Sequence, residues 1–140
     1  MIIEGIAKYL EVFGIGTWST AGTYGPSDIG IYRRVIPAAG SHITLTPYGL
    51  GDDILESSGQ LEPGVAGLEG LQVRTRANSK SSLETDQLAN RVFRALHGAR
   101  YPCPGVTHIW RQNWTSLGQD PGAETWARVD NYHVRINWRQ

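Results

Sequence analysis

Side chains that commonly bind metals or act as catalysts are few in this 140-residue chain, and their spacing is not diagnostic. The four histidines form no HxxxH or HExxH pair, and they are His42, His97, His108 and His133. A single cysteine, Cys103, lies between two prolines and has no partner for a disulfide or a cysteine-based zinc site. We therefore expect no metal, no cofactor and no catalytic centre.

Carboxylates are densest between Gly49 and Gly70, where the chain has five acidic residues, six glycines and no cation. Asp52, Asp53 and Glu56 could bind a divalent cation in principle, but the spacing of an EF-hand is absent. The preferred interpretation is a loop that faces solvent or a partner, because unstructured loops this long are usually functional or disordered.

Aromatic residues and arginines alternate near the C-terminus, where four of the five tryptophans lie between residues 110 and 138. Such a surface could stack single strands or RNA. Alternation favours an ordinary half-buried sheet instead, because apolar residues share one face of the last strand and polar residues the other. The apolar face has Trp126, Tyr132, Val134, Ile136 and Trp138, and the polar face has Asn131, His133, Arg135, Asn137 and Arg139. The basic row is then free for an acidic partner.

Formal charge is zero overall but uneven along the chain. Residues 1–70 hold 3 basic and 8 acidic side chains, whereas residues 71–140 hold 10 basic and 5 acidic ones. Two halves of opposite charge are suited to subunits that meet head to tail. Two solvated surfaces with a chance imbalance of charge explain the pattern equally well. A zero net charge disfavours non-specific DNA binding, and no apolar run approaches the roughly 20 residues of a membrane span. We expect a single cytosolic, soluble domain over residues 1–140.

Hydrophobic periodicity predicts a helix over residues 2–13, an uncharged loop over 14–27 and a hairpin of two strands around a turn at 37–41. A strand follows over 71–76. Ser81 and Glu84 predict a capping box at the start of a second helix, and His97 with Gly98 predict its end. A long C-terminal hairpin completes the order α-β-β-β-α-β-β. The expected fold class is α+β, with two helices on a mainly antiparallel sheet and a long acidic, glycine-rich loop at 49–70.

Five segments of the chain together carry a resemblance to known proteins. They are Leu117-Gly118-Gln119-Asp120-Pro121-Gly122, Asn131-Tyr132-His133-Val134, Ile43-Thr44-Leu45-Thr46-Pro47-Tyr48-Gly49, Leu71-Gln72-Val73-Arg74-Thr75-Arg76 and Ala95-Leu96-His97-Gly98. With these segments the chain resembles the tail terminator or minor capsid proteins of long-tailed bacteriophages, and the resemblance covers nearly the whole chain. Two departures are Ala123, where relatives often have arginine, and Ala38-Ala39-Gly40, where they often have a second proline.

The resemblance implies a virion protein that caps the tail tube as a ring, most simply a hexamer, and stops its polymerisation. Its partners would be copies of itself, the tail-tube protein and the head connector or neck, with genomic DNA passing through the ring and no membrane involved. Assembly would take place in the host bacterial cytoplasm. Alternatives are another neck protein, such as a head-closure or head–tail joining protein, and, more distantly, an RNA- or single-strand-binding module.

Subunit and partner contacts are expected at the acidic loop and at the basic rows of the strands. The residues expected to make them are Asp52, Asp53, Glu56, Arg74, Arg76, Arg128, Arg135 and Arg139.

Overall fold

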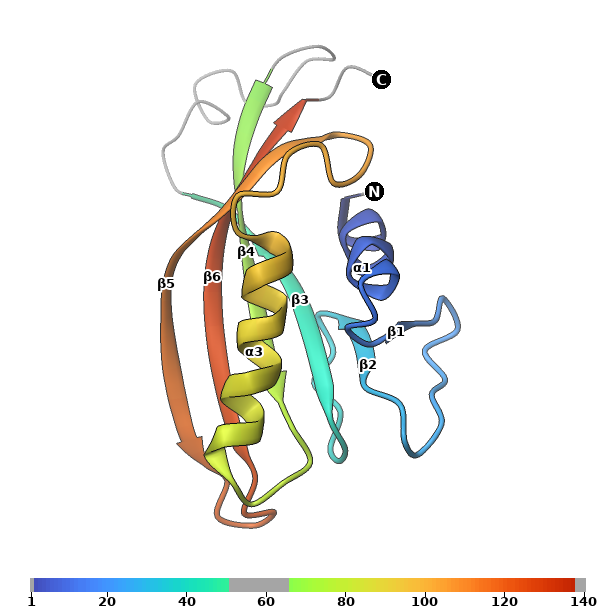
Figure 1. The fold of residues 1–140 in the computed structure, drawn as a ribbon, viewed down its shortest axis with the longest axis vertical. Helices are drawn as coiled ribbons and strands as arrows, with labels where there is room; N and C mark the ends of the chain where they lie inside the picture. The colour runs from blue at the N-terminus through green and yellow to red at the C-terminus, as the bar shows by residue number, and fades with distance from the viewer. Residues whose placement is uncertain (1, 51–65, 138–140) are drawn as a thin grey trace.

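The computed structural model describes residues 2–50 and 66–137, which form one mixed sheet with two helices on the same face (Figure 1). The sheet has six strands in the order β1-β2-β3-β4-β6-β5. The α+β prediction is therefore confirmed, with one strand more than expected. The elements are α1 (Ile2–Val12), β1 (Thr17–Trp18), β2 (Gly30–Arg33), β3 (His42–Tyr48), β4 (Ala66–Arg76), α3 (Ser82–Leu96), β5 (Val106–Gln119) and β6 (Trp126–Asn137).

Both helices form where the apolar spacing predicts them. Helix α1 buries Ile3, Ile6 and Leu10 against the sheet, and the chain leaves it through Gly14, whose φ of 74° suits glycine. Helix α3 has Ser81 as its N-cap, since the Ser81 side chain accepts from the Leu83 amide at 3.3 Å.

The expected capping box is only half formed. The Ser81 amide donates to the Ser79 hydroxyl at 3.0 Å, which leaves no role for Glu84 as its acceptor.

Strands β2 and β3 contradict the predicted hairpin, because they pair in parallel, with Gly30 opposite His42. Residues 34–41 return the chain to the start of β3 across the sheet face opposite the helices, which we call the open face. The Thr44 hydroxyl donates to the Val35 carbonyl at 2.7 Å and holds this connection there. So short a parallel return is possible because β2 pairs over only four residues. The proline and glycine in this connection are equally typical of a tight turn, which is why the sequence predicts a hairpin here.

Strand β4 begins at Ala66, so the last part of the loop predicted at 49–70 is strand instead. It lies antiparallel to both β3 and β6 and occupies the centre of the sheet. Its early start supplies the pairing partner for the C-terminal part of β6, with Ala66 opposite Asn137. Gly70 is required here, because a Cβ would lie 2.2 Å from the ring of Tyr48 on β3.

The β5–β6 hairpin is confirmed, and so is the alternation along β6. Tyr132, Val134 and Ile136 are buried in the core, while Arg135 is exposed on the open face. The expectation that Trp126 joins this core from the same face is wrong. Trp126 is half-buried, and its indole N–H donates to the Lys80 carbonyl at 3.0 Å. Trp138 lies outside the described residues.

A buried ion network joins the hairpin to α3. Asp130 is 1% exposed and accepts two hydrogen bonds from Arg128, each of 2.9 Å, and one from Arg111 of 3.1 Å. Arg128 also pairs with Asp86 on α3 at 3.5 Å. The guanidinium of Arg111 stacks 3.8 Å over the Phe93 ring of α3. Three elements therefore meet at the Asp130 carboxylate.

Replacing Asp130 by asparagine is expected to lower the free energy of unfolding by about 3–5 kcal/mol, because it leaves buried arginine charge without its counter-ion. Urea unfolding followed by circular dichroism measures the change. The matched control is Glu4→Gln, which removes a carboxylate from the exposed pair Lys8–Glu4 and should change stability by less than about 1 kcal/mol. Equal effects of the two substitutions would show that the Asp130 network does not hold the fold.

Candidate functional site

Metal-binding clusters are absent from the part of the chain that the structure describes. Within residues 2–50 and 66–137, no group of three or more His, Cys, Asp or Glu side chains could hold a metal ion. Over the same residues, no helix is long and apolar enough to cross a membrane. Cys103 is half-buried, and burial raises the pKa of its thiol. The candidate sites are two surfaces at the edges of the sheet.

One such surface is the outer edge of β5. Its first part is covered by the chain that follows α3, since the Gly98 amide donates to the Ile109 carbonyl at 2.8 Å. His97 continues this cover, because its Nδ1 accepts from the Arg111 amide at 2.9 Å. Beyond Arg111, residues 112–117 are all exposed. Among the described residues, no strand pairs with this outer edge.

This open edge of β5, residues 112–117, contains no charged side chain. Trp114 and Leu117 are 48% and 52% exposed on it. Natural sheet edges are usually protected by charges, prolines or bulges, because an open edge invites pairing with another chain. Here the register shifts after Arg111 and after Ser116 are the only such features among the described residues of this edge. An uncharged edge with two exposed apolar side chains is suited to a protein contact.

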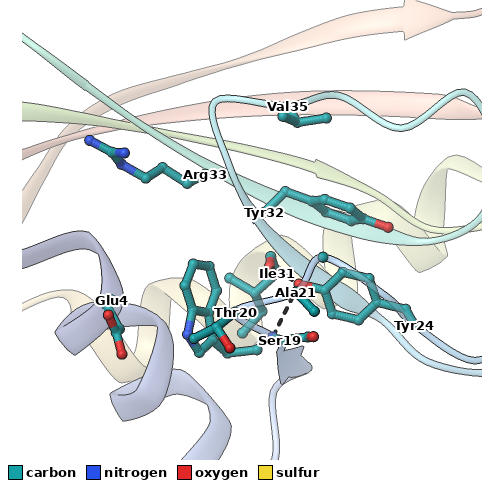
Figure 2. A pocket seen from close by; sticks show the side chains of 11 residues that line it. Glu4, Ser19, Thr20, Ala21, Tyr24, Ile31, Tyr32, Arg33 and Val35 are labelled. Carbon is teal, nitrogen blue, oxygen red and sulfur yellow. Dashed lines mark hydrogen bonds between the residues drawn. The ribbon is translucent and has the colours of Figure 1, made fainter.

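The opposite edge of the sheet, at β1 and β2, carries a cavity of about 470 Å³ (Figure 2). Figure 2 shows Glu4 of α1 at one end of it and Tyr24 with Tyr32 at the other. The Tyr24 hydroxyl donates to the Ile31 carbonyl and accepts from the Ser19 amide, which fixes the segment after β1 as one wall. The cavity is lined by Glu4, Trp18, Ser19, Thr20, Ala21, Gly22, Tyr24, Ile31, Tyr32, Arg33 and Val35.

This edge cavity was missed by the sequence reasoning, which treated residues 14–27 as an uncharged loop. The available signal was the pair of aromatic residues, Trp18 and Tyr24, within that segment. Trp18 also has a buried indole N–H without a hydrogen-bond partner among the described residues. Because β1 and β5 are the two ends of the strand order, the cavity and the open edge of β5 lie at opposite ends of one sheet.

The arginines expected at interfaces are separated by the fold. Arg74, Arg76 and Arg135 lie on the open face, and of these Arg135 is exposed. Arg128 faces the helices, is 3% exposed and is bonded to Asp130 and Asp86. The structure therefore offers an internal role for Arg128 that the sequence reasoning did not foresee. Asp52, Asp53, Glu56 and Arg139 lie outside the described residues.

The acidic surplus of the first half of the sequence does not lie in residues 2–50. This range has equal numbers of acidic and basic side chains, so this part of the sheet carries no acidic surplus. They are the acidic Glu4, Glu11 and Asp28 and the basic Lys8, Arg33 and Arg34. The surplus of the first half thus belongs to the sequence between residues 51 and 70.

His42 is the most strongly perturbed histidine and lies under the connection 34–41. Burial, followed by the nearby charges of Arg76 and Arg74, lowers the pKa of His42 from 6.5 to about 3. The imidazole is therefore neutral, and its Nε2 accepts from Arg74 Nη1 at 2.8 Å. Its role is to support Arg74 rather than to exchange protons.

Comparison with known proteins gives a likeness of fold. No protein-family model matches the chain, and no curated protein matches it. The structure is similar to a chain of the solved structure "Virion of native gene transfer agent (GTA) particle", with a TM-score of 0.53 and 16% sequence identity. The likeness covers 76% of this chain and 77% of the other. At this identity it shows that the two chains share a fold.

Replacing His42 by glutamine is expected to remove part of the acid sensitivity of the fold. The pKa of His42 is lower in the folded state than its ordinary 6.5, so protons bind the unfolded chain more tightly. Stability from the neutral imidazole is complete above about pH 6.5 and is lost as the pH falls towards 3. The wild type should lose about 2 kcal/mol more than His42→Gln between pH 7 and pH 5. Urea unfolding at both pH values measures this, and parallel losses would contradict it.

Proposed function

We propose that the protein is a structural component of a phage-like virion, and more narrowly a tail terminator that caps the tail tube as a ring, most simply a hexamer. The fold shared with a chain of a gene transfer agent virion supports the broader statement. The sequence resemblance to phage tail terminators supports the narrower one. The proposal includes no catalytic step and no cofactor.

The observation that carries the proposal is the presence of two unlike edges on one sheet. The edge at β1 is short and hollowed, whereas the edge at β5 is long, uncharged and open over residues 112–117. An edge of one copy that meets the opposite edge of the next makes a heterologous contact, and such contacts form a ring when the rotation closes. Trp114 and Leu117 are the apolar groups that such a contact would bury.

Termination follows from a ring with two different faces. One face must match the last ring of tail-tube subunits, and the other must lack the growing surface of the tube, so further addition stops. The second face would then meet the head connector or neck, with genomic DNA passing through the centre. The protein would assemble in the host bacterial cytoplasm and remain in the virion, at the tail or neck. A head-closure or head–tail joining protein would use the same edges against different neighbours.

A second candidate function is single-strand or RNA binding on the open face. Trp110 lies there with its ring centre 5.1 Å from that of His108 and 5.8 Å from that of His133. Arg135, opposite His108 in the sheet register, adds a cation. Aromatic rings beside arginine can stack bases, so this cluster could contact a strand.

Leu117→Lys is expected to prevent ring closure, because it places a charge on the open edge of β5 where an apolar contact is proposed. Leu83→Lys is the matched control, since Leu83 is equally a surface leucine, 61% exposed, on α3. Electron microscopy and light scattering with the purified tail-tube protein measure the assemblies. The wild type and Leu83→Lys should form hexameric caps on short tubes, and Leu117→Lys should not. Normal caps with Leu117→Lys would rule out this edge as the contact.

Single-stranded RNA is expected to bind weakly or not at all, because the chain has no net charge to attract phosphates. Fluorescence anisotropy with a labelled oligonucleotide between about 50 and 200 mM salt tests this. The paired variant is Trp110→Ala. Tight, salt-dependent binding that this substitution abolishes would favour the second candidate function over the first.

A further inference from the structure

A second cavity, of about 310 Å³, lies on the open face between β4 and the turn that joins β5 to β6. Arg74 and Arg76 enter it from neighbouring positions on the same face of β4. The turn between β5 and β6 supplies further residues of the cavity lining. We call this cavity the arginine pocket, and it is lined by Arg74, Arg76, Leu117, Gly118, Gln119, Asp120, Pro121, Thr125 and Ala127.

Both arginines are held in place by neutral acceptors. Arg76 donates through Nε to the Gly40 carbonyl and through Nη2 to the Pro37 carbonyl, each at 3.0 Å. Arg74 donates through Nη1 to the neutral ring of His42 at 2.8 Å. Each guanidinium keeps further N–H groups for another acceptor, since arginine has five. The pocket is therefore already organised before any partner arrives.

No ion pair with a described residue fixes the positive charge of this pair. Neither Arg74 nor Arg76 forms an ion pair with any carboxylate in residues 2–50 or 66–137. Burial lowers the pKa of both side chains, and the charge of Arg76 lowers that of Arg74 further. Arg128 differs in this respect, because Asp130 is its bidentate carboxylate partner. An anion in the pocket would relieve this repulsion.

Thr125 supplies an independent sign of a missing ligand. It lines the pocket and is 7% exposed, and its Oγ1 has no hydrogen-bond partner among the described residues. A buried hydroxyl without a hydrogen-bond partner is unfavourable, because it has lost its bonds to water. An acceptor atom placed beside the arginines would satisfy it.

Asp120 lines the same cavity but does not fill this role. Its charge raises the pKa of both arginines, but its Oδ1 accepts instead from the amides of Gly122 and Ala123. Its negative charge opposes any anion in the pocket, and the effect is greatest for a nucleic acid backbone, on which phosphates follow one another about every 1.7 Å of duplex. A lone carboxylate brings a single negative charge near Asp120, so it meets less of this repulsion.

We propose that the arginine pocket binds the carboxylate of an aspartate or glutamate from an acidic segment of a protein partner. The carboxylate accepts from the free N–H groups of Arg74 and Arg76, and the Thr125 hydroxyl donates to it. Arginine and carboxylate match in shape, and such charge-assisted bonds are about twice as strong as neutral ones. This binding does not require the ring, because every group in the pocket belongs to one chain.

A labelled peptide with the sequence of residues 51–57, Gly-Asp-Asp-Ile-Leu-Glu-Ser, is a suitable probe because it is the most acidic segment of this chain. Anisotropy with the full-length protein should show saturable binding that weakens at least tenfold in Arg74→Gln. Thr125→Val should weaken binding severalfold without loss of stability, since its hydroxyl has no hydrogen-bond partner to lose among the described residues. The control Arg100→Gln removes an exposed arginine outside the pocket and should bind like the wild type. Melting temperatures check that each variant is folded.

The companion probe has asparagine and glutamine in place of the three acids, and a short DNA duplex serves as competitor. No binding of the acidic peptide would overturn the proposal, and so would equal binding of the amide peptide. Displacement by duplex at lower concentration than by unlabelled peptide would also overturn it, in favour of a phosphate ligand. A negative result in this binding assay would not affect the ring-assembly experiment, in which the wild type and Leu83→Lys should still form caps. The two proposals are therefore tested separately.

Discussion

The carboxylate of Asp130 is the point on which the C-terminal half of the structure depends. It lies 1% exposed between two arginines, and the arginines in turn reach α3 through Asp86 and the ring of Phe93. Loss of any one of these partners would leave a buried charge uncompensated, so the network ties α3, β5 and β6 together. The same arrangement places the guanidinium carbon of Arg128 4.2 Å from the centre of the Trp114 ring, and Trp114 remains 48% exposed on β5.

That open edge and the cavity at β1 are consequences of how the sheet ends. Every inner strand has neighbours on both sides, and both helices cover a single face. Among the described residues, the surfaces that this arrangement leaves uncovered by a helix or a strand are the two edges and the open face. The two edges differ in length and shape, which favours contact between unlike surfaces of successive copies over contact between like ones. A ring is the closed assembly that such contacts can build.

The polar groups of the open face are arranged by residues 34–41, which connect the parallel strands β2 and β3. Residues 34–41 cross this face, bury His42 and supply the carbonyls that hold Arg76. With His42 neutral and Arg76 bound to uncharged oxygens, the two arginines beside Thr125 form no ion pair with a carboxylate among the described residues, and Asp120 is the nearby negative charge. A connection that looks like a simple turn in sequence thus prepares a site for an acid.

Local patterns in the sequence determined α1, α3 and the β5–β6 hairpin, because apolar period, capping and turn residues act within a few positions of each other. The alternation along β6 likewise placed Tyr132 and Arg135 on opposite faces. Only the tertiary structure decided that β2 and β3 are parallel and that Arg128 is internal. Strand direction and the choice between a solvated and a paired arginine depend on residues far apart in the chain, such as Asp86 for Arg128. The two cavities are decided in the same way, since each is walled by segments that meet only after the sheet has formed.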